Sequence, residues 1–256
     1  MDYLQDPEND GIARVEHFRR IVDGQVEASD SYLGIPIFAS HGLHDYAAEE
    51  MRRLGLVQPG KSALDIACGA GAMSQRLGDS GMRVLGLDAL PGIFRAKGPT
   101  ICHAGTDANA RFEATVTEAV DLVVAMEIVE HVENPRAFLR SCFACLRPGG
   151  VLFLTTPNTD SSYSVVSLLL NGHFARFDDA YLRNDGHISP ICRHQLLAAG
   201  ADAGFELISE AGFGRDQVAA RSWPKFWVLL QLARLLRRVP ESREAMISTY
   251  ALRRPA

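Results

Sequence analysis

The sequence lacks the features of a secreted protein and of a general nucleic-acid-binding protein. Its net charge is −5, so the basic surface on which nucleic acids usually bind is not expected. The first residues, Met1 to Asp6, are acidic and contain no apolar stretch of the kind that forms a signal peptide. We therefore expect a cytoplasmic protein, and we do not expect nucleic acid among its partners.

Cysteine is also scarce, with five residues, an odd number. Without a secretion signal, an odd count favours reduced thiols over a disulfide framework. Cys142 and Cys145 form a C-x-x-C pair, but no second pair accompanies them. We expect these two cysteines to lie in a helix over 134–147 and to pack against a sheet.

The sequence does contain an alternation of apolar strands and amphipathic helices. Strands are predicted at 62–67, 82–88, 100–104, 121–126, 151–155, 205–211 and 245–252. Helices are predicted at 44–54, 72–79, 90–97, 109–119, 134–147 and 191–203. This alternation predicts an α/β fold with a doubly wound parallel sheet and right-handed crossovers.

The most informative stretch runs from Ala63 to Gly71 and reads D-x-x-x-G-x-G from Asp65 onward. Glycine at 69 and 71 allows a positive φ and a close approach of a ligand to the backbone. The turn leads into a helix near Ala72, whose unpaired N–H groups favour an electron-rich ligand. Asp88 ends the next strand, where a carboxylate can accept hydrogen bonds from a ribose. These features indicate a nucleoside-cofactor pocket.

Three further segments support a more specific assignment. They are Asp121–Met126, the L-x-P-G-G turn and strand of Leu146–Leu154, and Thr156-Pro157-Asn158. With the glycine turn, they resemble the class I S-adenosylmethionine (SAM)-dependent methyltransferases over roughly residues 43–213. A dinucleotide site would have a third glycine where this chain has Met73-Ser74.

The resemblance implies a Rossmann-like seven-stranded sheet, mostly parallel with an antiparallel last strand, in one methyltransferase domain over 1–256. A helical region over 1–55 would precede a SAM-binding core over 56–155. The residues implied to bind SAM are Asp65, Ala67, Gly69, Gly71, Asp88, Ala89, Asp107 and Glu127.

Two segments are longer than ordinary loops, at 156–190 and 212–244. We expect both to form helical insertions on the substrate side of the sheet. Within the second, residues 223–238 predict a helix with a broad apolar face and a narrow polar stripe. Three interpretations stay open for it: packing on the domain or in a dimer contact, a lid over an apolar substrate, and a helix lying on a membrane surface.

The pattern E-x-x-E-H at Glu127, Glu130 and His131 is spaced so that one helical turn would place all three on one face. His187 follows in the first long segment. The pattern resembles the ubiquinone-biosynthesis O-methyltransferases and the metal-dependent small-RNA 2′-O-methyltransferases. That resemblance makes Glu127, Glu130, His131 and His187 candidate ligands of a divalent metal such as magnesium, manganese or zinc.

The same side chains also have interpretations that need no metal. His131, Glu130 and His187 could be catalytic, with His131 as a base, or they could be structural. His41 and His44, on either side of Gly42, could contact substrate or only cap a helix.

The preferred function is therefore a SAM-dependent O-methyltransferase that acts on a hydroxyl of a small molecule or a glycan-type acceptor. Two alternatives stay open. One is a metal-dependent RNA 2′-O-methyltransferase, and the other is a non-catalytic subunit of the same fold that binds a partner.

Overall fold

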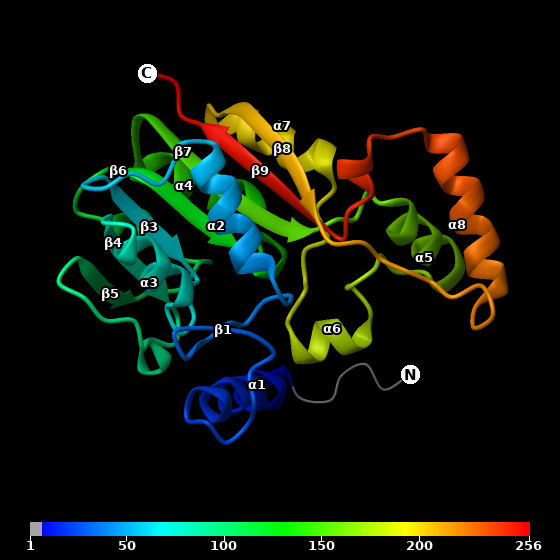
Figure 1. The fold of residues 1–256 in the computed structure, drawn as a ribbon, viewed down its shortest axis with the longest axis horizontal. Coiled ribbons are helices and arrows are strands. Elements are labelled where there is room, and N and C mark those ends of the chain that lie inside the picture. Colours follow the sequence, from blue (N-terminus) through cyan, green and yellow to red (C-terminus); the bar gives the residue numbers. More distant parts are fainter. Residues whose placement is uncertain (1–6) are drawn as a thin grey trace.

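A computed structural model describes the backbone of residues 7–256 and the side chains from residue 15 onward, so Met1 to Asp6 lie outside it. Its centre is a seven-stranded sheet in the order β5-β4-β3-β6-β7-β9-β8 (Figure 1). The strands are β3 (Ser62–Ile66), β4 (Arg83–Asp88), β5 (Ile101–Gly105), β6 (Val120–Met126), β7 (Leu146–Pro157), β8 (Glu206–Phe213) and β9 (Ile247–Arg253). Six strands of this sheet run in one direction and β9 runs opposite to them, so that it is antiparallel to β7 and β8, as predicted for the last strand.

The central strands are apolar because both of their faces are covered. Side chains alternate between two cores, so that Leu64 and Val123 join one, and Ala63 and Val124 the other. The first core includes α4 (Pro135–Cys145) and α7 (Arg193–Ala203), and the second includes α2 (Leu43–Arg53) and α3 (Ala72–Asp79). All four helices agree with the sequence prediction to within about two residues. Cys142 and Cys145 are buried in α4, as expected.

Two predicted helices are wrong. The segment 90–97 forms only the short 3-10 turn η1 (Pro91–Ile93), because Gly98 and Pro99 end it and Phe94 turns inward to stack on His103 at 4.3 Å. The segment 109–119 forms only η2 (Phe112–Ala114). Its run of β-branched residues after 114 has low helix propensity, and burial of Phe112 fixes an irregular path instead.

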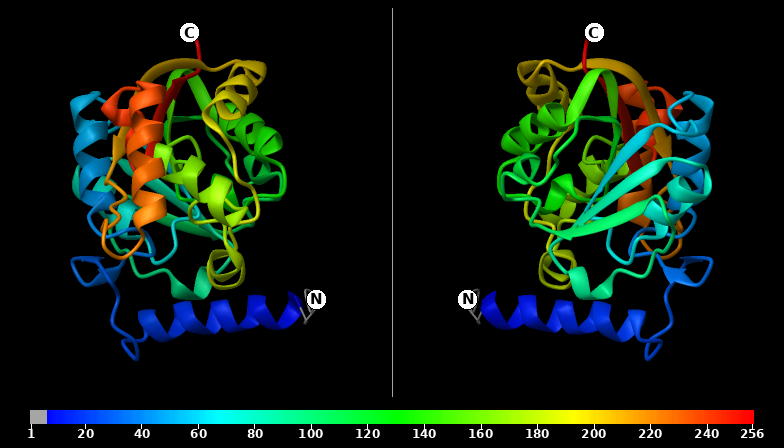
Figure 2. Two further views of the ribbon diagram at one scale, coloured as in Figure 1. Left: turned by 90° about the vertical axis from the view of Figure 1, so that its right-hand side faces the viewer. Right: turned by 90° about the vertical axis from the view of Figure 1, so that its left-hand side faces the viewer.

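The chain outside the core gathers at the carboxyl ends of the parallel strands. The hairpin of β1 (Ser31–Tyr32) and β2 (Ile35–Pro36) links the core to α1 (Pro7–Val22), which extends across this edge (Figure 2). The insertions hold the helices α5 (Ser162–Asn171), α6 (Asp179–Asn184) and α8 (Pro224–Arg237), with the 3-10 turn η4 (Glu241–Glu244) before β9.

Helices α5 and α8 pack together at the end of the sheet opposite β5 (Figure 1). None of the helices described here has the length and apolar character that crossing a bilayer requires.

Candidate active site

A cavity of about 1280 Å³ opens at the carboxyl edge of the sheet. Its walls come from the ends of β3, β4, β5 and β6, with α1 and α6 on the outer side. Eight of the residues singled out from the sequence line it: Ala67, Gly69, Asp88, Ala89, Asp107, Glu127, His131 and His187. Three others, Asp65, Gly71 and Glu130, lie behind its surface.

Backbone strain gathers around this cavity. Ala67 and Glu127, which follow β3 and β6, have φ values of 55° and 50°, and Arg176 has 66°. All three line the cavity. Left-handed backbone is costly for residues other than glycine, and such residues cluster at functional sites.

The glycine corner after β3 is tied to Asp88 at the end of β4. The backbone N–H of Gly69 donates to one carboxylate oxygen of Asp88 at 2.8 Å, and that of Leu90 donates to the other at 2.8 Å. The two bonds hold the carboxylate rigidly at the cavity wall. Each oxygen still has capacity to accept another hydrogen bond, as a ribose diol would require.

Gly71 has another role in the structure. Its φ is 90°, and a Cβ atom there would lie 2.6 Å from the ring of Phe94. The absence of a side chain therefore makes room for Phe94 behind the corner.

Asp65 lies one layer deeper and is 3% exposed. Its carboxylate accepts a hydrogen bond of 2.6 Å from the hydroxyl of Ser74. Burial raises the pKa of Asp65 to about 7, and the nearby negative charge of Asp88 adds to this shift. Asp65 lines a second, smaller cavity of about 60 Å³, which Ala67 and Gly69 line as well.

His44, which the sequence offered as a possible substrate contact or a capping residue, lines the same small cavity. Within the described residues, its buried Nδ1 has no hydrogen-bond partner. Burial lowers the pKa of His44 to about 4, and the positive charge of Arg76 contributes, so the ring is neutral at pH 7. The only sequence signal was its position at the start of a helix, which also fits a capping histidine.

The E-x-x-E-H segment does not form the helical turn that its spacing predicts. Only Val129–His131 is helical, as the 3-10 turn η3, and Glu127 precedes it in left-handed backbone. The three side chains therefore do not share one face. Glu127 and His131 line the cavity, whereas Glu130 is fully buried behind it.

Separate hydrogen bonds hold the two glutamates. The hydroxyl of Thr155 donates to Glu127 at 3.0 Å, and that of Thr156 donates to Glu130 at 3.0 Å. Burial raises the pKa of both carboxyl groups, and the charge of Glu127 raises that of Glu130 further.

His187 lies beside His131, with ring centroids 4.8 Å apart in an edge-to-face arrangement. The N–H groups of Ile188 and Ser189 both donate to the carbonyl of Glu130, which brings the 186–189 loop onto η3.

Each of the two rings contacts a backbone carbonyl through Nδ1, His131 with Gly186 at 3.1 Å and His187 with Arg176 at 2.7 Å. A carbonyl oxygen only accepts, so these contacts require a hydrogen on Nδ1. In the neutral rings, Nε2 is then the basic nitrogen.

Glu130, His131 and His187 place one ligand atom each within 4.8 Å of one another. Glu127 lies outside this group. Oε1 of Glu130 is buried without a hydrogen-bond partner among the described residues, 3.8 Å from Nε2 of His131. A carboxylate and two imidazoles that donate Nδ1–H to carbonyls fit a divalent transition metal or zinc.

Comparison with known proteins assigns the chain to a family. The model of the family described as "Methyltransferase domain" matches residues 39–210, which contain the whole glycine corner, Asp88 and the Glu/His segment. The chain belongs to this family of methyltransferase domains.

Sequence relatives of this methyltransferase include ubiquinone biosynthesis O-methyltransferases. It is 41% identical over 104 residues to the protein of Methylobacterium sp. (strain 4-46), a match that covers 39% of this chain and 42% of that protein. With the Cereibacter sphaeroides (strain ATCC 17029) protein it is 40% identical over 121 residues, covering 44% and 48%. The chain thus spans about half the length of the curated relatives it matches, from 41% to 52%.

Solved structures share the fold of this methyltransferase. A chain of the complex between the Haloferax volcanii Trm112 methyltransferase activator and a methyltransferase superposes with a TM-score of 0.61 at 18% identity, covering 99% of this chain and 100% of that one. A SAM-dependent methyltransferase of Archaeoglobus fulgidus superposes with a TM-score of 0.56 at 16% identity, covering 82% and 94%.

Proposed function

We propose that this methyltransferase transfers the methyl group of SAM to a hydroxyl of a small molecule or a glycan-type acceptor. The single observation behind this proposal is that Asp88, His131 and His187 line one cavity. A ribose-binding carboxylate and a pair of basic imidazoles thus face a common space. The sequence relatives are ubiquinone biosynthesis O-methyltransferases, which supports oxygen as the acceptor atom.

In this proposal SAM lies across the glycine corner. Its ribose hydroxyls donate to Asp88, and its adenine extends toward Asp107. Its amino-acid end enters the small cavity, where Asp65 as a carboxylate pairs with the ammonium group and His44 contacts the carboxylate. The large cavity exceeds the volume of roughly 300–1,000 Å³ of an ordinary small-molecule site, so it has room for an acceptor beside the cofactor.

The reaction needs a deprotonated oxygen in line with the methyl carbon. The acceptor oxygen forms a bond to that carbon while the carbon–sulfur bond breaks, and the sulfonium becomes a neutral thioether. Nε2 of His131 takes the hydroxyl proton as a general base, because Nδ1 already carries the hydrogen given to Gly186. His187 orients the His131 ring from the side.

The same side chains also suit the binding of a divalent metal ion. Glu130, His131 and His187 would hold the ion, and Glu127 would not bind it directly. Such an ion would lower the pKa of a bound acceptor hydroxyl.

Chelation separates the two mechanisms. If His131 acts as a base without a metal, methyl transfer from labelled SAM survives exhaustive dialysis against a chelator. If the metal is required, activity is lost and returns with manganese or zinc.

An RNA 2′-O-methyltransferase has weaker support. Among the described residues that line the cavity, the arginine and lysine side chains are Arg19 and Arg176, and Arg176 is neutralised by Asp216 at 2.8 Å. A polyphosphate backbone would need more cations than this. A subunit without catalytic activity would give no heat with SAM in calorimetry, whereas the proposed enzyme binds it.

A further inference from the structure

Helix α5 buries hydroxyl side chains and exposes apolar ones. Its buried side chains include Ser162, Ser164 and Ser167, and its exposed side chains are Val165, Leu168, Leu169 and Leu170, followed by Asn171. Burial of hydroxyls and exposure of leucines is the reverse of what a helix on a water-facing surface shows. The residues of the outer face therefore need an explanation other than folding of the domain.

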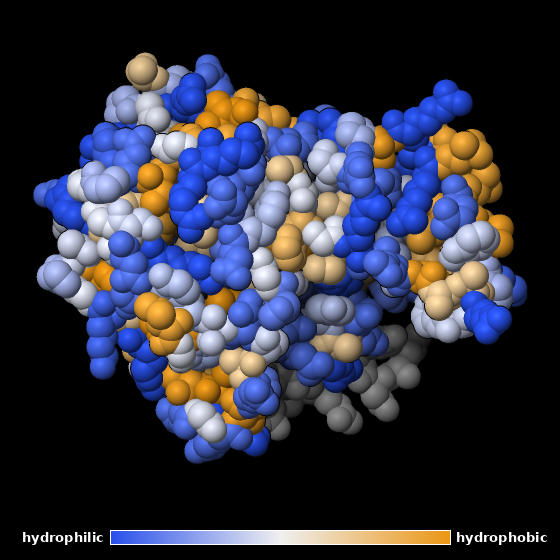
Figure 3. Space-filling view, in the orientation of Figure 1, coloured by the Kyte–Doolittle hydropathy of each residue, from blue (hydrophilic) through white to orange (hydrophobic). Residues whose placement is uncertain are grey.

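Helix α8, which packs on α5, also exposes apolar side chains, although its inner face is apolar too. Phe226 and Leu230 point inward to Val166 of α5. The outer side chains are again mostly apolar, with Leu235 66% and Leu236 71% exposed. The large exposed apolar residues of this helix and of the turn before it are Trp223, Trp227, Val228, Leu232, Leu235 and Leu236. Figure 3 shows hydrophobic residues gathered along the outer edge of α8.

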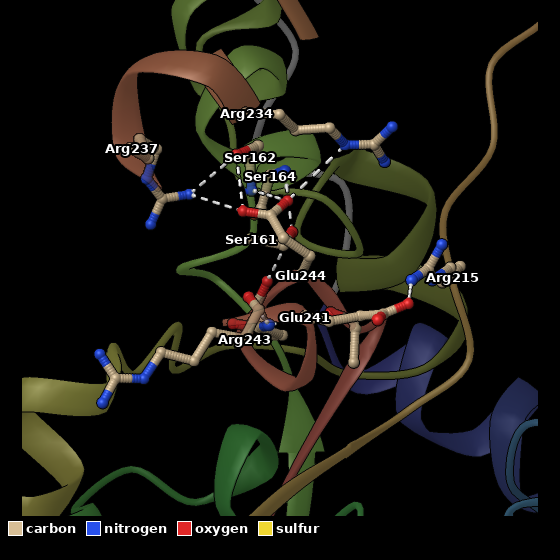
Figure 4. Close-up of polar contacts among 11 residues, drawn as sticks. Ser161, Ser162, Ser164, Arg215, Arg234, Arg237, Glu241, Arg243 and Glu244 are labelled. Atoms are coloured by element: carbon tan, nitrogen blue, oxygen red, sulfur yellow. Dashed lines mark hydrogen bonds and ion pairs between the residues drawn. The ribbon is translucent and has the colours of Figure 1, made fainter. Parts of the chain in front are cut away.

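Polar contacts on the inner side fix this orientation. The carboxylate of Glu244 accepts hydrogen bonds from the N–H and the hydroxyl of Ser162, at 3.1 and 2.7 Å. Arg234 and Arg237 of α8 turn toward the same carboxylate, each 3.8 Å away (Figure 4). Rotating α8 to bury its leucines would expose Phe226 and break this network, so the apolar face stays outside.

The outer face also has a distinctive charge. Between Asp216 and Glu241 the sequence contains five basic residues and no acidic one, although the whole chain has a net charge of −5. Arg234 and Arg237 are engaged with Glu244 on the inner side. Arg221, Lys225 and Arg238 are exposed and flank the apolar residues.

Both tryptophans of the chain, Trp223 and Trp227, lie on this face and are exposed. Tryptophan beside basic residues on an amphipathic helix is typical of segments that lie in a membrane interface.

We propose that the outer faces of α5 and α8, with the turn at 221–225, form a docking surface for an anionic lipid bilayer. The 14 residues of α8 reach about 21 Å, short of a bilayer core of about 30 Å, so the helix lies along the surface. A second copy of the chain fits less well, because a two-fold contact would bring two sets of Arg221, Lys225 and Arg238 together without acidic partners.

Vesicle binding by the full chain tests this surface. Vesicles of phosphatidylglycerol and phosphatidylcholine should co-sediment with the protein and shift its tryptophan emission to shorter wavelength. Vesicles of phosphatidylcholine alone should do so much more weakly. Since both tryptophans lie on the proposed surface, the emission reports on this face directly.

Two variants separate the two components of binding. Replacing Arg221, Lys225 and Arg238 with glutamine should lower the partition coefficient by about 100-fold, since each basic residue near an anionic surface contributes about fivefold. The double substitution Leu235→Ser/Leu236→Ser should lower it at least tenfold. Leu33→Ser is the matched control, because Leu33 is 76% exposed but lies on the β1–β2 turn.

Each result decides for or against the proposal. Absence of binding by the wild-type protein, or equal binding by wild type and both variants, overturns it. So does a concentration-dependent dimer in light scattering that Leu235→Ser/Leu236→Ser abolishes while vesicles have no effect. Heat of SAM binding, measured on every variant, confirms that each is folded and keeps this test separate from that of the catalytic proposal.

Discussion

The imidazole rings of His131 and His187 meet edge to face at the wall of the large cavity, each with Nδ1 on a backbone carbonyl. Because Nδ1 of His131 donates its hydrogen to the carbonyl of Gly186, Nε2 is the basic nitrogen of the neutral ring. We predict that His131→Ala lowers kcat by on the order of 10²–10⁴, the range of general-base contributions, with little change in SAM affinity. Single-turnover methyl transfer and calorimetry measure the two effects. His173→Gln, at a histidine outside the cavity, is the control, and an equal loss of SAM affinity and turnover in His131→Ala would contradict the assignment.

Asp88 is the residue on which cofactor binding depends most in this account. In Asp88→Asn, an amide nitrogen replaces one carboxylate oxygen, so the N–H of either Gly69 or Leu90 loses its hydrogen-bond acceptor. The ribose hydroxyls lose a negatively charged acceptor as well. Because hydrogen bonds to charged groups contribute about 1.5–3 kcal/mol each, SAM affinity should fall by roughly 10- to 100-fold. Calorimetry of Asp88→Asn against Asp202→Asn, an exposed acid on α7, makes the comparison. Unchanged affinity in Asp88→Asn would show that the ribose lies elsewhere.

The raised pKa of Asp65 predicts a pH dependence of stability without SAM. Because this carboxyl holds its proton up to about pH 7 in the folded protein and only to about pH 4 when unfolded, the folded state binds more protons between these values. The contribution of Asp65 to the free energy of unfolding therefore falls as pH rises from 4 to 7, by on the order of 3 kcal/mol.

Denaturant melts of wild type and Asp65→Asn across this range measure the difference, since the amide does not titrate. If the stability difference between the two proteins stays constant with pH, the carboxyl is ionised in the folded protein. SAM affinity should rise over the same interval in wild type only, as the carboxylate that pairs with the ammonium group forms.

His44 predicts a slope of opposite sign over nearly the same pH range. Its pKa is about 4 in the folded protein and ordinary when unfolded, so the unfolded state binds more protons between pH 4 and 6.5. Its contribution to stability is present above pH 6.5 and is lost as pH falls through 4. The charged groups that act on it are Arg76, Asp30 and Asp45.

His44→Gln should remove this slope and also weaken SAM binding. Comparison with His41→Gln, whose side chain is 80% exposed, controls for the loss of a histidine near α2. The same acid sensitivity in His44→Gln and wild type would mean that His44 does not carry it.

The strands and most core helices could be predicted because their signals are local. Leu64 and Val123 belong to apolar runs that only a sheet covered on both faces explains, and the glycine corner before Asp88 has a known spacing. The predictions of helices at 90–97 and 109–119 were wrong because the stacking of Phe94 on His103 and the burial of Phe112 outweighed a weak helical pattern.

The site was predicted in part for the same reason. Glu127 enters left-handed backbone after β6, a tertiary constraint that no spacing rule contains, and so Glu130 moves behind the cavity. The burial of His44 and the inward turn of Arg234 and Arg237 toward Glu244 also depend on distant segments. Periodicity shows that a helix has two faces, but it does not say which one meets the domain.

The most direct measurement is a crystal structure of this chain with S-adenosylhomocysteine. We predict that the ribose hydroxyls lie on the Asp88 carboxylate, the adenine near Asp107, and the amino-acid end between Asp65 and His44. A ribose bound away from Asp88, or an empty glycine corner at saturating ligand, would contradict it.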